Sequence, residues 1–231
     1  MSADLTALHR GFNATTRTHW DRYAVHRRRV TTLLLAGGNG QGRLCVLGAG
    51  NCNDLDLADA QLDDAGLAAY AEAPERELPA QLDGPYDAVA SCCLLTQLID
   101  TLVHRFGETH ARFAALVQAV RLGHLRLLAS LAAPGGVAVL VTDFLSSEAY
   151  PALSTLAPPV LGRALAEQVQ KGNVFHGVHP GALMQALRGD AVLATRAESI
   201  ETAQPLVWDI GARHYAVCAV RFRRRAEPSP A

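Results

Sequence analysis

The chain has 231 residues, of which 49% are hydrophobic and 19% charged, a balance typical of one globular domain and not of a disordered segment. Its formal net charge of −1 gives no overall attraction to nucleic acid or to an anionic membrane, so we expect neither as a partner. Two arginine-rich clusters, at 27–29 and 221–225, are interpreted as solvated faces or tails.

Cysteine usage indicates a reducing compartment. The five cysteines include no C-x-x-C pair and fall mostly in apolar runs, which suits buried thiols and not a disulfide framework. No apolar stretch approaches the ~18 residues of a membrane span, and residues 1–10 lack the apolar core of a signal peptide. We therefore expect a cytoplasmic location. The sequence does not indicate an oligomeric state.

The beginning of the chain is predicted to be helical. Apolar positions recur at helical spacing within residues 4–36, and the glycine-rich run 37–42 then ends any helix. We divide the chain into a helical segment at 1–42, one domain at 43–225 and a disordered tail at 226–231.

A strand followed by a glycine turn is the feature around which the domain is predicted to form. Residues 44–48 are typical of a short, buried strand of a parallel sheet, and they lead into Gly48-Ala49-Gly50. Glycine permits positive φ and a close approach of ligand to backbone, and a helix starting beyond the turn would point its N–H groups at that ligand. The pattern predicts a ligand cradle; an ordinary α/β glycine turn is the alternative.

The next segment is harder to interpret. Residues 54–70 predict one helix, or two short helices broken near Gly66. Residues 71–85 contain prolines and acidic side chains, which indicate an exposed connection. No run of β-branched or aromatic residues predicts a strand between Leu47 and Tyr86.

Regular alternation follows. Strands are predicted at 87–92 and 137–142, and between them two helices at 94–106 and 109–132, ended by a turn at 133–136. Further along the chain we predict helices at 161–170 and 180–188 and strand segments at 191–200, 205–208 and 214–222. The last two segments are expected to form a hairpin. Alternating strands and helices predict an α/β fold with a doubly wound, mostly parallel sheet.

In this order the elements resemble a class I S-adenosylmethionine-dependent methyltransferase, whose sheet is Rossmann-like. Residues 46–50 resemble the first motif of that family, and 87–91 resemble the motif on its fourth strand. Residues 131–142 resemble its helix, Pro-Gly-Gly turn and fifth strand, and the closing hairpin is similar to its last two strands. The resemblance covers residues 43–223.

The resemblance has two departures. Cys52 stands at the third position of the glycine motif, and about 37 residues separate Gly50 from Asp87. The family fits a helix, a strand, another helix and a third strand into this interval, which requires roughly 50 residues or more. We therefore expect one strand–helix unit to be missing or reduced.

The resemblance implies S-adenosylmethionine as cofactor and a small-molecule acceptor. No spacing of ligand residues indicates a metal, so we expect none. It places the cofactor beside Gly48, Ala49, Gly50, Asn51, Asp54, Asp64, Ser91 and Cys92. Asp54 would bond the cofactor amine or cap a helix, and Asp64, or Asp63 beside it, would meet the ribose or lie on a helix surface. Ser91 and Cys92 would lie near the methyl group or simply enter a turn. Catalytic residues are not identified.

Other polar residues have two interpretations each. Asp143 ends the predicted fifth strand at the edge where α/β proteins bind ligands, or it starts a loop. His19, Trp20, Tyr23 and His26 are candidates for a lid over the cofactor; core packing is the favoured interpretation for the aromatic pair.

Two histidines follow the fifth strand. His176 and His179 lack further ligands at a supporting spacing, so we exclude a metal site there and consider them candidates to line a substrate pocket.

Three functions compete at this point. The first is a methyltransferase, and the second is a degenerate relative that keeps the fold as a binding or scaffold domain. The third, a nicotinamide dehydrogenase, ranks last, because its motif requires glycine where the chain has Asn53.

Overall fold

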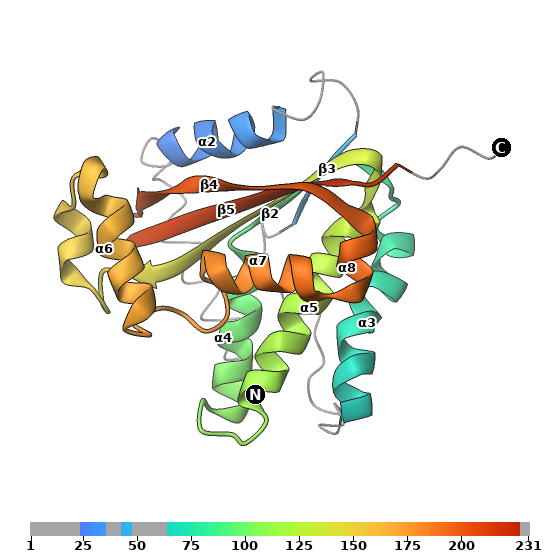
Figure 1. The fold of residues 1–231 in the computed structure, drawn as a ribbon, viewed down its shortest axis with the longest axis horizontal. Helices are drawn as coiled ribbons and strands as arrows, with labels where there is room; N and C mark the ends of the chain where they lie inside the picture. Colours follow the sequence, from blue (N-terminus) through green and yellow to red (C-terminus); the bar gives the residue numbers. More distant parts are fainter. Residues whose placement is uncertain (1–23, 36–42, 48–63, 227–231) are drawn as a thin grey trace.

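The computed structural model describes residues 24–35, 43–47 and 64–226, and within them five strands form one open, mixed sheet (Figure 1). The strands are β1 (Leu44–Leu47), β2 (Tyr86–Cys92), β3 (Ala132–Ser146), β4 (Ala197–Asp209) and β5 (His214–Arg224). Their order is β1-β2-β3-β5-β4. β1, β2 and β3 are parallel, whereas β5 runs antiparallel to both β3 and β4. The predicted α/β class and C-terminal hairpin are confirmed.

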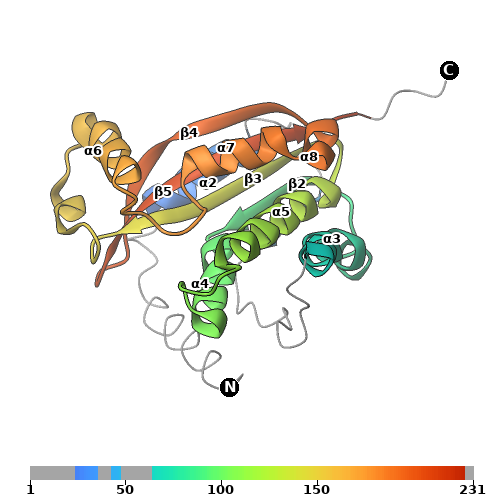
Figure 2. The ribbon, with the colours of Figure 1, turned by 60° about the horizontal axis from the view of Figure 1, so that its bottom comes forward.

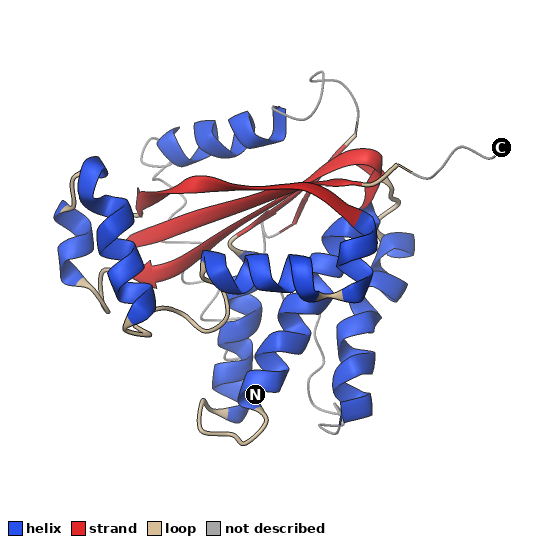
Figure 3. Ribbon diagram, viewed as in Figure 1, coloured by secondary structure: helices blue, strands red, loops and turns tan. Residues whose placement is uncertain are grey.

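Helices lie on both faces of this sheet (Figures 2 and 3). The described helices are α2 (Ala24–Leu35), α3 (Asp64–Gln81), α4 (Leu94–Phe106), α5 (Phe113–Leu131), α6 (Pro158–Gln170), α7 (Pro180–Gly189) and α8 (Ala191–Arg196), with a short 3-10 helix, η2 (Pro151–Thr155). α2 covers one face, and α4, α5, α7 and α8 lie on the other (Figure 1).

The core is divided by the sheet into two unequal parts. The larger part packs α4, α5 and α7 against one face, with Leu95, Leu128 and Leu140 fully buried. The smaller part packs Val30 and Leu33 of α2 against a row of valines on the opposite face. Apolar burial at about 25 cal/mol per Å² therefore stabilises the α5 face more than the α2 face.

β1 differs from the buried strand that its composition predicts. It has only four residues and forms an edge of the described sheet, and Leu44 and Val46 are 53% and 48% exposed. Only Cys45 and Leu47 pack against the larger core. The prediction of full burial is wrong, because an apolar sequence run does not reveal which strand lies at the edge of a sheet.

Polar contacts of Arg43 hold β1 beside β2. The backbone N–H of Arg43 donates to the Asp87 carboxylate at 2.7 Å, and its guanidinium donates to the Asp83 carbonyl at 2.6 Å. The same guanidinium lies 4.8 Å from the centre of the Tyr86 ring. These contacts fix the register in which Leu44 pairs with Ala88.

The segment predicted as an exposed connection after residue 70 is helical instead. α3 runs from Asp64 to Gln81 through Pro74 and Pro79, although a proline inside a helix costs about 3 kcal/mol. Ala71 is buried, and its backbone approaches α5 closely at Gly123. Packing against α5 therefore outweighs the local cost of the prolines.

β3 begins earlier and ends later than predicted. The run 133–136 is extended and already part of the strand, with Gly135 at a φ of 77°. A Cβ at Gly136 would lie 3.0 Å from the Asp87 carbonyl oxygen, so glycine there lets β2 and β3 approach. Asp143 does not end the strand, because β3 continues to Ser146; pairing with β5 stabilises the extension.

Two further predictions are corrected near the C-terminus. Residues 191–196 form α8 and not a strand, because the Asp190 carboxylate caps the helix by accepting from the N–H of Leu193 at 3.0 Å. The arginines of β5 are not a solvated tail: Arg223 donates to the Gly135 carbonyl at 2.9 Å, and Arg224 to the Ala132 carbonyl at 2.7 Å. They tie β5 to the start of β3.

Candidate functional site

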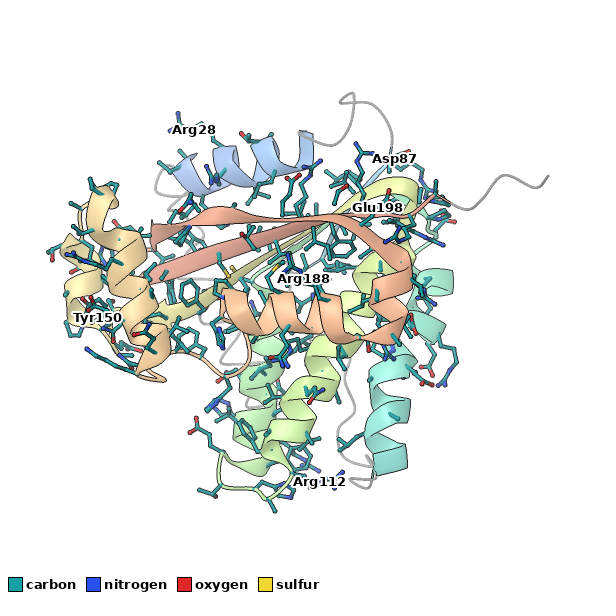
Figure 4. All side chains as sticks on the ribbon, in the orientation of Figure 1. Arg28, Asp87, Arg112, Tyr150, Arg188 and Glu198 are labelled. Carbon is teal, nitrogen blue, oxygen red and sulfur yellow. The ribbon has the colours of Figure 1, made fainter. Side chains whose placement is uncertain are left out.

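The carboxyl edge of β2 and β3 is the described region where an α/β sheet of this kind binds ligands. It lies at the end of the sheet opposite to Asp87 and Glu198, and Tyr150 lies beyond it (Figure 4). β2 ends at Cys92, Cys93 forms the turn, and α4 starts at Leu94.

Cys93 has an unusual backbone. Its φ of 54° and ψ of 23° are left-handed, a conformation that costs a residue with a Cβ about 1–2 kcal/mol. Its N–H donates to the Val141 carbonyl at 2.8 Å, which ties the turn to β3. Left-handed residues of this kind cluster at functional sites, and Cys93 marks this turn as a candidate.

A carboxylate lies beside this turn. Asp143 Oδ1 accepts a hydrogen bond from the Thr96 hydroxyl at 2.8 Å, and the same hydroxyl lies 2.8 Å from Thr142 Oγ1. Burial raises the pKa of Asp143, although the hydrogen bond from Thr96 opposes this by stabilising the charged form. The edge therefore holds an acid near the start of α4, where the helix dipole also favours negative charge.

Ser91 does not face this edge. Its hydroxyl lies 2.7 Å from His124 Nε2 of α5, and the two residues are 0% and 3% exposed. Burial lowers the pKa of His124 to about 4, so the ring is neutral at physiological pH. The pair resembles a nucleophile with its base, but both residues are buried and cannot meet a substrate.

Neither thiol at the turn is activated. Burial raises the pKa of Cys92 to about 11. Burial and the nearby Asp143 carboxylate raise the pKa of Cys93 well above its usual value. Hydrolases place nucleophiles at strand–turn–helix arrangements of this kind. The thiolate is the reactive form of cysteine. Because both thiols have raised pKa values, neither is placed here as a nucleophile.

Most of the expected cofactor residues lie outside the described residues, so their roles stay predictions. These residues are Gly48, Ala49, Gly50, Asn51, Asp54 and Asp63. Asp64 is the first residue of α3, and Cys92 lies at the carboxyl end of β2, where the resemblance places the reacting methyl group. The structure therefore describes only the β2 side of the expected pocket.

The proposed lid residues are described only at His26, since His19, Trp20 and Tyr23 lie outside the described part. The His26 ring stacks on Trp208 of β4 with centroids 4.5 Å apart and an angle of 11°. It is 8% exposed, and burial lowers its pKa to about 4. His26 thus packs α2 onto the sheet.

The two histidines after β3 have separate structural roles. His176 Nε2 lies 3.2 Å from the Glu108 carboxylate, and its ring packs edge-on against Phe113. His179 caps α7, where its Nδ1 accepts from the N–H of Ala182 at 3.3 Å. Among the described residues, no group of three or more His, Cys, Asp or Glu is placed to hold a metal ion.

Sequence reasoning missed Thr96 and His124. Thr96 lies in the first turn of α4, where its contact with Asp143 follows from the return of β3 beside β2. His124 stands in an otherwise apolar stripe of α5, and a lone histidine on such a face is the one available signal of a buried polar partner.

Fold and site together define an α/β chain in which the described part forms a mixed, five-stranded sheet with a polar carboxyl edge. No protein-family model matches the chain, and no curated protein matches it. None of the described helices is both long and apolar enough to cross a membrane.

Proposed function

We propose that this chain is a class I S-adenosylmethionine-dependent methyltransferase with a doubly wound, Rossmann-like sheet and a small-molecule acceptor. The observation that carries the proposal is the pairing of β1 with β2. The two strands are parallel neighbours, although a long stretch of chain separates them in the sequence. In a doubly wound sheet the first and fourth strands are neighbours at the point where strand order reverses, and ligands bind outside their carboxyl ends.

Two further features support this proposal. The strand that resembles the family's fifth lies directly beside β2, after the Pro-Gly-Gly run that brings it close to Asp87. The last two strands form an antiparallel hairpin on β3. The order of strands is thus compatible with the resemblance in sequence.

The cofactor would be held mainly by the chain after β1. Backbone N–H groups of residues 48–51 would hold its carboxylate, Asp54 its amine and Asp64 its ribose hydroxyls. At the described edge, the hydrogen bond from Thr96 favours the charged form of Asp143 against the effect of burial, and the Cys92 thiol is uncharged. The cofactor supplies an already activated methyl group, so the protein mainly aligns the acceptor with it.

A scaffold without catalysis is the second candidate. The described part of the interval between Leu47 and Tyr86 contains the single helix α3 and no strand. The strand that carries the family's ribose-binding acid is therefore not among the described elements. A chain without that strand would keep the fold and bind the cofactor poorly.

Calorimetry with S-adenosylmethionine and with S-adenosylhomocysteine, each at millimolar concentration, tests the proposal. We expect saturable heat and a raised melting temperature, because a ligand that binds only the folded state stabilises it. Gly50→Asp should abolish binding by placing a charged side chain in the cradle. Gly189→Asp is the matched control, since a Cβ there meets no atom within 4 Å. Absence of heat and of any thermal shift in the wild type would leave the scaffold function.

A further inference from the structure

A groove between α2 and β4 lies on the face of the sheet opposite to α5 and α7. It is about 370 Å³ in volume, within the usual range for small-molecule sites. Its walls are both apolar and basic, with Val25, Arg28 and Arg29 from α2 and Pro205 and Leu206 from β4.

A second, smaller cavity adjoins the groove. The two share Arg29, Gln204 and Leu206, and the inner cavity measures about 10 Å³, room for roughly one water or one ligand oxygen. His26 lines the inner cavity. Its Nδ1 is buried and has no hydrogen-bond partner within the described part of the chain. An unpartnered buried polar atom costs about 1–3 kcal/mol of stability. Such an atom is therefore expected at a site where a bound ligand supplies the missing hydrogen bond.

β4 contains a β-bulge beside the groove. The pairing of β4 with β5 shifts register between Ala203 and Leu206, so that Gln204 and Pro205 leave the regular ladder and line the groove. Bulges of this kind re-aim side chains and are frequent beside binding sites.

The charge of the groove is positive. None of the described residues that line either cavity is acidic. Among the described residues, the Arg29 side chain forms no ion pair or hydrogen bond, and the Arg28 side chain bonds only the Ala24 carbonyl of its own helix, through Nε. Figure 4 shows Arg28 on the outer side of α2, which places it at the rim of the groove and leaves Arg29 as its inner cation.

We propose that this groove binds a small amphipathic carboxylate, an apolar ring or chain that carries one acid group. The planar guanidinium of Arg29 matches a carboxylate, which it can bind through two parallel hydrogen bonds. Val25, Pro205 and Leu206 would contact the apolar body, and His26 Nδ1 would meet an oxygen in the inner cavity. The site is separate from the carboxyl edge, so the proposal does not depend on binding of a methyl donor.

Titration calorimetry with three probes tests the chemistry of the groove. Benzoate carries both the ring and the acid, benzamide the ring without the charge, and inorganic phosphate the charge without the ring. We expect saturable binding of benzoate and binding at least about tenfold weaker of the other two. If benzamide bound as tightly as benzoate, the proposed role of the arginine would be overturned. If phosphate bound as tightly as benzoate, the proposed role of the apolar walls would be overturned.

Variants then locate the site. Arg29→Gln should weaken benzoate about tenfold or more, whereas Arg188→Gln, on α7 across the sheet, removes the same charge and should have no effect. Arg29 is exposed, so the variant should keep the fold, which circular dichroism checks. Benzoate should also shift the ring-nitrogen NMR signal of His26. No saturable binding of benzoate, or equal affinity in Arg29→Gln and wild type, would overturn the proposal.

Discussion

The Thr96 hydroxyl donates a hydrogen bond to Asp143 Oδ1 across 2.8 Å and so joins the first turn of α4 to β3 at the carboxyl edge. Burial raises the pKa of Asp143, and this hydrogen bond is the largest opposing contribution. The contact therefore lowers the pKa of Asp143 and favours its charged form.

Thr96→Val should raise the pKa of Asp143 further. An acid whose pKa is raised by folding binds more protons when folded, so its contribution to stability falls as pH rises from about 4 through the folded-state pKa. The variant should therefore lose more stability than the wild type as pH rises from about 4 through the folded-state pKa, measured by urea unfolding at each pH.

Two controls accompany this measurement. Thr101→Val removes a hydroxyl of α4 that bonds only the Gln97 carbonyl of its own helix, and it should leave the pH dependence unchanged. Asp143→Asn should remove the dependence that Asp143 causes. A Thr96→Val profile parallel to that of the wild type would mean that the hydrogen bond does not stabilise the carboxylate.

Buried histidines should destabilise the fold in acid. Burial lowers the pKa of both His26 and His124 to about 4, whereas an unfolded histidine titrates near 6.5. The folded state thus binds fewer protons, and stability present above about pH 6.5 is lost as pH falls towards 4, by up to about 3 kcal/mol per group.

His26→Phe isolates the contribution of α2, because phenylalanine keeps an aromatic ring against Trp208. We expect a shallower loss of stability between pH 6.5 and pH 4.5, measured by thermal unfolding. His104→Phe is the control, since that side chain is 49% exposed. An unchanged slope in His26→Phe would show that α2 does not hold His26 in its buried position.

The ion pair of Arg126 and Asp190 joins α5 to the junction of α7 and α8. Two hydrogen bonds, at 2.7 and 3.2 Å, connect side chains that are 13% and 8% exposed. Although burial alone would raise it, the pKa of Asp190 is lowered, because hydrogen bonds and the Arg126 charge favour the carboxylate.

Arg126→Met should leave that carboxylate buried without its partner, at a cost of about 3–5 kcal/mol. The double variant with Asp190→Asn should recover part of the loss, since asparagine can still accept the cap bond from Leu193. Chemical denaturation of the three variants measures the coupling. Additive losses would indicate that the pair contributes nothing beyond its separate members.

Elements with strong local signals were predicted well from the sequence. The predicted bounds of α4 are those observed, because its apolar residues recur at helical spacing and Gly107 ends it. The hairpin of β4 and β5 turns where predicted, with Gly211 at a φ of 96°.

Features set by tertiary contacts were not predictable. The path of α3 through Pro74 depends on α5, and the exposure of Val46 depends on the strand order. At the candidate site, the position of Cys92 at the end of a strand was predictable, but the direction of the Ser91 side chain depends on His124, which lies on a distant helix. The periodicity of a sequence predicts which face of a helix or strand is apolar. It does not predict which other element will pack against that face.

The close approach of α3 to α5 at Gly123 gives a prediction with an internal control. A Cβ at Gly123 would lie 2.9 Å from the Ala71 carbonyl oxygen and 3.4 Å from Pro74 Cγ, so α3 would have to move. Overpacking of this kind costs about 1–3 kcal/mol, which exceeds the gain of up to about 1 kcal/mol in helix propensity. Gly123→Ala should therefore lower the free energy of unfolding.

Gly162→Ala makes the same change inside α6, where a Cβ meets no atom within 4 Å. Only the propensity gain applies there, and the variant should be more stable by about 0.5–1 kcal/mol. Urea denaturation of both variants measures the two opposite signs. If Gly123→Ala were stabilised like Gly162→Ala, α3 would not pack against α5 as described, and packing would not explain why α3 continues through its prolines.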